Sequence, residues 1–168
     1  MKVTLLAAWL YLTCFLTPSI GQAQTPNSKI SLQLGRVTVW LGMPQTDALL
    51  QLQSAGYQVF GSSTDRLIKD GKNDYSVSFE TGRLVYASRD WYNEETNEID
   101  AVLGALAALA SHGSTLCSVL SAPISRPDES AERVFITCGE RSVVLMRGHF
   151  ASSKNSFVSA SEQIGQPK

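Results

Sequence analysis

The stretch YSVSFETGRLVYAS, residues 75–88, is the most regular strand pattern in the chain. Aromatic and aliphatic residues alternate with serines from Tyr75 to Phe79, the segment 80–83 contains a glycine, and apolar residues then resume. Period-two alternation on both sides of a short glycine-containing connection is typical of a β-hairpin that buries one face. We therefore expect two antiparallel strands here.

Amphipathic segments on both sides of this hairpin predict two helices. The segment 44–55 begins with a proline, which suits the first helical position, and is followed by Gly56, a common helix stop. The second helix is predicted over 99–110, with Asn93 or Thr96 as its cap and an apolar stripe along one face.

The cysteines that follow the second helix, Cys117 and Cys138, are predicted to form a disulfide. They fall in two predicted strands, 116–124 and 132–138, which a turn-rich segment joins. In a hairpin that is symmetric about 127–128 the two cysteines face each other, and cross-strand neighbours are close enough for a bridge. A structural bridge is favoured over a redox pair, because redox pairs are typically spaced as Cys-x-x-Cys at a helix start.

The order of these segments predicts an α+β fold. Alternation over 30–41 adds a strand or two before the first helix, and a further strand is expected after Cys138. We expect two helices packed on one face of an antiparallel sheet, in an order compatible with a tandem helix-plus-hairpin repeat. Residues 30–150 would form this single domain, and the Ser-, Lys- and Gln-rich segment 151–168 is predicted to be a disordered tail.

The first residues predict export. Residues 1–23 have a positive start at Lys2, an apolar run, and a small-residue exit that ends at Ala23, where cleavage is expected. Cys14 lies inside this segment without the small preceding residue of a lipoprotein signal, so it is expected to be removed with the signal. A flexible leader over 24–29 would follow. The mature protein is predicted to be soluble and periplasmic or secreted, where an oxidising compartment favours disulfides.

Composition and motifs exclude several functions. The formal net charge is −1 and the basic residues are scattered, so nucleic acid is not an expected partner. The apolar helix segment 99–110 is too short to cross a membrane, so no membrane span is expected in the mature chain. The only two histidines, His112 and His149, lack the spacing of metal ligands, and no hydrolase or phosphate-binding motif occurs. We predict no metal, cofactor or catalytic residue, and the interpretation leans away from an enzyme.

Aromatic side chains are the candidate interface residues. Trp40 is out of phase with the apolar residues beside it, and Trp91 and Tyr92 lie at a junction between strand and helix. Tryptophan and tyrosine often anchor protein interfaces. Packing in the core is the alternative role for each of the three.

Two short motifs resemble a family of bacterial envelope domains. The segment LGMPQTDALL, residues 41–50, and the segment FETGRL, residues 79–84, resemble the SmpA/OmlA and beta-lactamase-inhibitor-like small envelope domains. The resemblance covers about residues 34–91. It implies a non-enzymatic domain that acts by protein contact, in assembling envelope complexes or inhibiting a target.

Together these observations predict an exported, non-enzymatic protein-interaction module whose partner is another envelope or secreted protein. The alternative is a small hydrolase or ligand-binding protein that uses a cleft between sheet and helices. In that alternative His112 or His149 would act as the base.

Overall fold

The computed structural model describes residues 29–91, 97–111, 116–125, 129–150 and 156–166. The predicted leader, most of which precedes residue 29, and the predicted signal peptide lie outside these ranges. Within these described ranges, ten strands and two helices follow one another: β1 (Ser31–Leu34), β2 (Val37–Trp40), α1 (Gln45–Ser54), β3 (Gln58–Gly61), β4 (Asp65–Lys69), β5 (Asp74–Glu80), β6 (Arg83–Asp90), α2 (Glu98–Ala110), β7 (Ser118–Ser125), β8 (Glu129–Cys138), β9 (Arg141–Phe150) and β10 (Ser156–Gly165).

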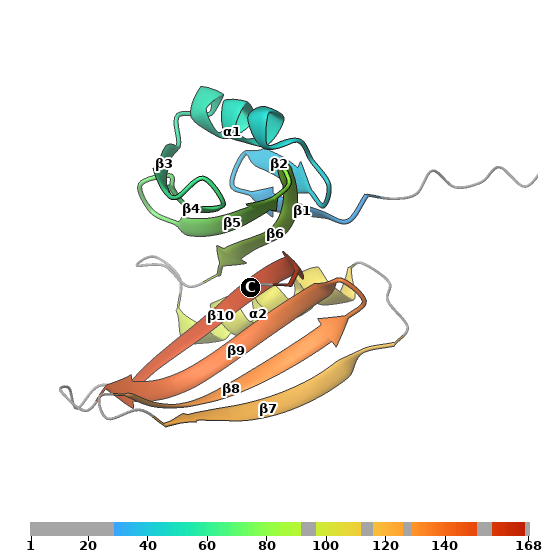
Figure 1. Ribbon diagram of the computed structural model, residues 1–168. Coiled ribbons are helices and arrows are strands. Elements are labelled where there is room, and N and C mark those ends of the chain that lie inside the picture. The colour runs from blue at the N-terminus through green and yellow to red at the C-terminus, as the bar shows by residue number, and fades with distance from the viewer. Residues whose placement is uncertain (1–28, 92–96, 112–115, 126–128, 151–155, 167–168) are drawn as a thin grey trace, which may run out of the picture.

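Eight of the strands form one antiparallel sheet (Figure 1). Their order is β3-β4-β5-β6-β10-β9-β8-β7, and β1 and β2 form a separate two-stranded sheet. The last strand, β10, therefore lies in the middle of the large sheet, where it pairs with β6 on one side and β9 on the other. It joins the N-terminal half, β1 to β6 with α1, to the C-terminal half, α2 with β7 to β9.

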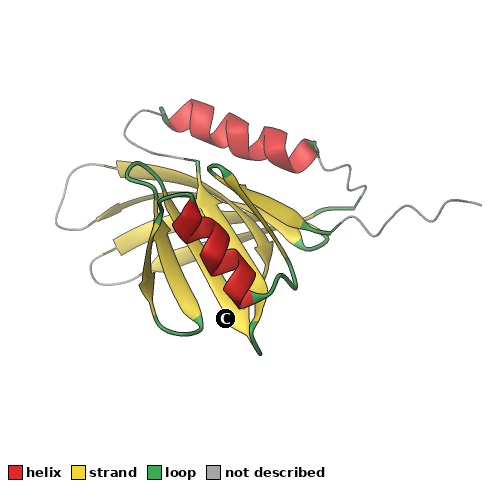
Figure 2. Ribbon diagram, turned by 90° about the horizontal axis from the view of Figure 1, so that it is seen from above, coloured by secondary structure: helices red, strands yellow, loops and turns green. Residues whose placement is uncertain are grey.

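The α+β prediction is wrong, because the structure is a β-rich fold in which 58% of the described residues lie in strands. The two helices lie over separate parts of the molecule (Figure 2) and do not form a layer on one sheet face. The predicted disordered tail is also wrong where β10 forms. The alternation of β10 escapes notice because its buried positions hold Ala160, Glu162 and Ile164, two of which are small or charged.

The N-terminal half has the larger apolar core. The β1–β2 hairpin and α1 cover it with fully buried side chains that include Leu32, Leu34 and Leu52. Helix α1 begins at Gln45, one residue later than predicted, so that Pro44 caps it instead of forming its first residue. Gly56 follows the helix in the left-handed conformation, as predicted. The β5–β6 hairpin is confirmed, with Glu80 paired to Arg83 across a two-residue turn.

Helix α2 packs on β9 and β10 through its smallest residues. Ala101 and Ala105 are buried against the sheet, whereas Ile99 and Leu103 point away from it. Asn97 caps the helix by accepting a hydrogen bond from the Asp100 backbone N–H at 2.9 Å. The predicted caps were wrong by a few residues and lie outside the described ranges.

The cysteine hairpin is confirmed together with its register. β7 and β8 pair antiparallel with Ser118 opposite Thr137, and the Cys117–Cys138 disulfide closes the end of the ladder next to this pair. The bridge ties the start of the edge strand β7 to β8. It also fits an oxidising compartment.

Candidate functional site

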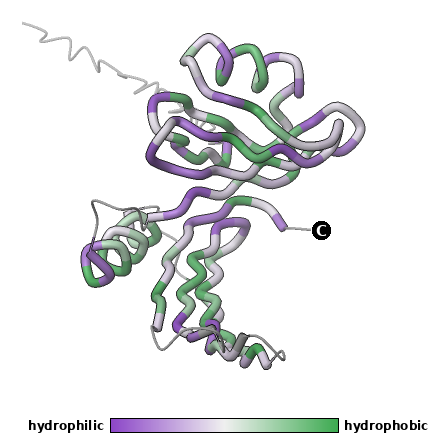
Figure 3. Tube along the Cα trace, turned by 90° about the vertical axis from the view of Figure 1, so that its left-hand side faces the viewer, coloured by the Kyte–Doolittle hydropathy of each residue, from purple (hydrophilic) through white to green (hydrophobic). Residues whose placement is uncertain are grey.

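Several large apolar side chains are exposed on α2 and on or beside β7, in the C-terminal half of the molecule. We call them the α2–β7 surface; each is more than half exposed, and the members are Ile99, Leu103, Leu116, Val119 and Leu120. Figure 3 shows α2 standing at the side of the sheet with apolar stretches along it. Val119 pairs with Ile136 on the α2 side of the sheet and Leu120 pairs with Phe135 on the other side, so the set extends around the β7 edge. Exposed groups of large apolar side chains often mark binding sites.

Incomplete cover of the sheet explains why this surface is exposed. Helix α2 contacts β9 and β10, and the ring of Trp91, next to β6, packs against Gly104 on one flank of the helix. Leu106 lies on the opposite flank of α2, since residues two apart on a helix differ by about 200°. That flank faces β8 and β7, where Ile136 is half-buried and Val119 is exposed.

The edge strand β7 adds unpaired backbone groups to these apolar side chains. Among the described residues β7 pairs only with β8. The Cα atoms of Cys117 and Cys138 are 4.2 Å apart, which is typical of an antiparallel pair without mutual hydrogen bonds. Odd-numbered residues of β7, such as Val119 and Ser121, therefore direct their N–H and C=O groups away from β8. Pro123 has the same parity and lacks an N–H, which fits this assignment.

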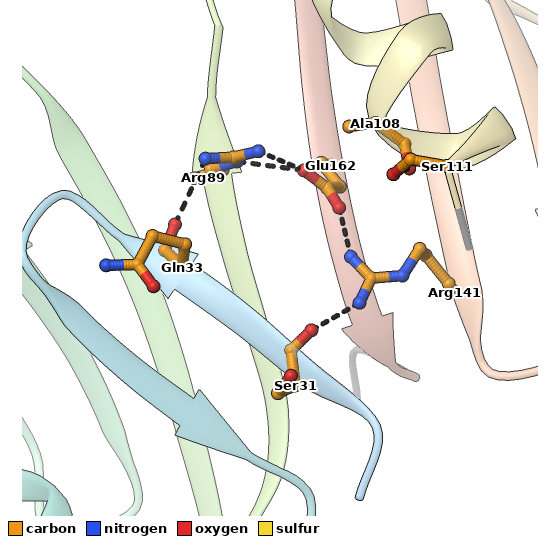
Figure 4. A network of polar contacts seen from close by, with 7 residues as sticks. All are labelled: Ser31, Gln33, Arg89, Ala108, Ser111, Arg141 and Glu162. Carbon is orange, nitrogen blue, oxygen red and sulfur yellow. Dashed lines mark hydrogen bonds and ion pairs between the residues drawn. The ribbon is translucent and has the colours of Figure 1, made fainter. Parts of the chain in front are cut away.

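A buried ionic network joins the two halves at the strand that links them. Glu162 of β10 is 1% exposed and accepts hydrogen bonds from Arg89 of β6, at 2.8 Å, and from Arg141 of β9 (Figure 4). The two guanidinium groups also donate to the Gln33 and Ser31 carbonyls of β1. Every charged group in it has a partner, so the network fixes β1 against β6 and β10 and offers no free group for chemistry.

A groove of about 790 Å³ lies on the face of the sheet opposite α2. It runs between the β5–β6 turn and the β8–β9 turn, and its lining includes Glu80, Thr81, Arg83, Phe135, Thr137 and Gln163. No histidine lies among the lining residues. His149 is an exposed residue of β9, and His112 lies outside the described residues.

The predicted aromatic interface residues are dispersed in the part of the chain that the structure describes. Trp40 is half-buried against the N-terminal core, with the Lys29 ammonium 4.6 Å from its ring centroid. Trp91 is half-buried in the C-terminal core, with the Arg89 guanidinium 4.1 Å from its ring centroid. Tyr92 lies outside the described residues. The role of these three side chains at an interface stays a prediction.

Sequence reasoning missed the α2–β7 surface although its signal is present. Residues 116–125 contain no charged side chain. Natural edge strands commonly carry lysine, another charge or proline, which discourage pairing with other chains. A predicted strand with one proline and no charge next to a surface helix is the pattern that would have identified it.

The described residues contain no group of three potential metal ligands and no helix that is long and apolar enough to span a membrane. No protein-family model matches the chain, and no curated protein or solved structure matches it significantly.

Proposed function

We propose that this chain is an exported, non-enzymatic protein-interaction module that binds its partner through the α2–β7 surface. The single observation that carries the proposal is the exposure of large apolar side chains on α2 and β7 beside a sheet face that the helix leaves half-covered. Burying such side chains contributes about 25 cal/mol for each Å² removed from water.

The expected partner is another envelope or secreted protein that presents an apolar helix or strand. The disulfide supports an oxidising location, and the apolar N-terminal segment 1–23, cleaved after Ala23, would direct the chain to the periplasm or the medium. The resemblance of residues 41–50 to envelope domains that act by protein contact agrees with this proposal. Nucleic acid is not a proposed partner.

Leu103 and Leu50 provide a matched test of the surface. Both are helical leucines of similar exposure, 58% and 65%, but only Leu103 belongs to the α2–β7 surface. A photoreactive amino acid at 103 should capture a specific protein in the native host, identified by mass spectrometry, and the same group at 50 should not. Leu103→Asp should abolish binding of the captured protein, whereas Leu50→Asp should retain it. Equal capture at both positions, or at neither, would contradict the proposal.

The second candidate function is binding of a small ligand in the groove opposite α2. Its volume lies within the usual range of ligand pockets, and both charge signs line it through Glu80 and Arg83. Binding of a small molecule, measured by calorimetry, should be lost in Thr137→Trp, which fills the groove. A hydrolase in this groove would need a base other than His149.

A further inference from the structure

The edge of β7 that no other described strand covers is short, and its ends are defined. The outward-directed N–H groups belong to Cys117, Val119 and Ser121, and the series ends at Pro123, which has none. A strand added to this edge therefore gains backbone hydrogen bonds only over 117–121. The centre of that window is Val119.

The side chains of residues 117–121 allow this segment to pair with the same segment of a second copy of the chain. In an antiparallel pair centred on Val119, that residue faces its counterpart, Cys117 faces Ser121, and Ser118 faces Leu120. No charge faces a like charge, which is the usual obstacle when a strand pairs with itself. If the pair were centred on Ser121 instead, Pro123 would face Val119, and the hydrogen bond to the Val119 carbonyl would be lost because Pro123 has no N–H.

Exposed apolar side chains on both faces of β7 also favour a second copy of β7 as the partner. Val119 lies on the α2 side of the sheet and Leu120 on the other side, and they are 68% and 64% exposed. In a second β7, Val119 is directly opposite Val119, and on the other face Leu120 is diagonal to Leu120 across Ser118, so both faces of the edge lose apolar surface to water. A two-fold contact of this kind is self-complementary by symmetry.

From these observations we infer that two copies of this chain pair through β7, antiparallel and centred on Val119, to form one continuous sheet. The two-fold axis is then perpendicular to the sheet, so both α2 helices lie on the same face, on either side of the bare strands. The inference rests on the proposed function, since it names one occupant of the α2–β7 surface, and it leaves Leu103 free for the heterologous partner.

Introducing a charge at Val119, the centre of the proposed two-fold contact, tests this register. Val119→Arg and Val119→Glu should each be monomeric in analytical ultracentrifugation, with a dissociation constant raised at least about tenfold, because like charges face each other. An equimolar mixture should restore a dimer that contains one of each. Leu50→Arg is the control at a similarly exposed apolar site outside the surface, and it should remain dimeric like the unmodified protein.

A backbone variant keeps the test independent of charge. Ser121→Pro removes one outward N–H and leaves the pairing with β8 intact, so it should also be monomeric while retaining the disulfide and the circular dichroism of the unmodified protein. A monomeric unmodified protein, a dimer that persists in both Val119 variants, or a mixture that does not reassociate would each overturn the inference. Photocapture at position 103 is measured independently of the dimer. If the unmodified protein is monomeric but position 103 still captures a protein, only the β7–β7 contact is refuted. If the dimer forms but position 103 captures nothing, only the heterologous partner is refuted.

Discussion

Replacing Glu162 with glutamine should destabilise the fold strongly. The carboxylate is 1% exposed and holds two guanidinium groups, of which Arg141 is 5% exposed as a residue and Arg89 has a side chain that is 21% exposed. Glu162→Gln removes the negative charge and places an amide N–H₂ against at least one guanidinium, which is itself only a donor. Removing one partner from a buried ion pair costs about 3–5 kcal/mol, because the remaining charge stays buried without compensation.

The loss is large on the scale of a domain whose total stability is about 5–15 kcal/mol. Urea unfolding followed by circular dichroism should show a lower midpoint and an unchanged slope, which indicates a change in stability alone. Glu140→Gln is the control, since Glu140 is exposed on the neighbouring β8–β9 turn and its replacement should change stability by less than about 0.5 kcal/mol.

The reasoning can be refuted in two ways. A cost below about 1 kcal/mol for Glu162→Gln would mean that water or a rearranged arginine compensates the buried charge. Conversely, a variant with methionine at 89, 141 and 162 should be less destabilised than Glu162→Gln, because no charge remains to be compensated. If the triple variant were the less stable of the two, the network would be stabilising in its own right.

Three further predictions concern local structure. Gly104→Ala should destabilise by about 1–3 kcal/mol in urea unfolding although alanine favours helices, because its Cβ would lie 2.7 Å from the Trp91 ring; a gain in stability would show that the ring moves aside freely. Thr81→Asn should raise the melting temperature modestly, since Thr81 has φ 48 in a two-residue hairpin turn that asparagine adopts more readily; an unchanged or lower value would contradict this. Burial would raise the pKa of Asp70, but hydrogen bonds from Tyr75, Asn73 and Lys72 outweigh it and hold that pKa below its usual 3.8. The stability advantage of the unmodified protein over Asp70→Asn should therefore be present above about pH 4 and disappear as pH falls through the lowered pKa, and a pH-independent difference would count against it.

Local patterns were sufficient to predict the two hairpins and the disulfide. In β5–β6 and β7–β8, the partner strand is the next strand in the sequence, so alternation and turn residues fix the pairing before any distant contact forms. The register of Cys117 against Cys138 follows from the same short-range argument, and the structure confirms it.

The position of β10 could not be predicted, because β6, its partner on one side, is distant in sequence. Glu162 looks like a solvent-facing residue until Arg89 and Arg141 are placed on either side of it, and those arginines come from strands far from it in the chain or across an intervening loop. The alternation rule treats a charged residue as exposed, so it assigns the segment to a polar tail. Only the assembled sheet turns this position into a buried one.

Which face of α2 is buried could not be predicted for a different reason. The sequence suggests that the large apolar residues of α2 face the core. The buried face is instead formed by Ala101, Ala105 and Leu109, and the Trp91 ring occupies the space beside Gly104. Small residues let a helix approach a sheet closely, and the Ile99 and Leu103 side chains are then left outside. The candidate site exists because this packing choice exposes what the pattern predicted to be buried.

The C-terminal half therefore depends on support from outside its own core. Half of its six buried residues are alanines, and the others are Val143, Leu109 and Cys138. The N-terminal cluster contains leucines, aromatics and a methionine. Since apolar stabilisation scales with the area buried, this half gains less from its core than its neighbour does. The disulfide, worth about 3 kcal/mol for a loop of this length, and the β6–β10 ladder with its ionic network compensate for the difference. The half that carries the proposed binding surface is thus held in shape by a covalent bridge at one end and by the stable half at the other, which leaves its large apolar side chains available for contact with another chain.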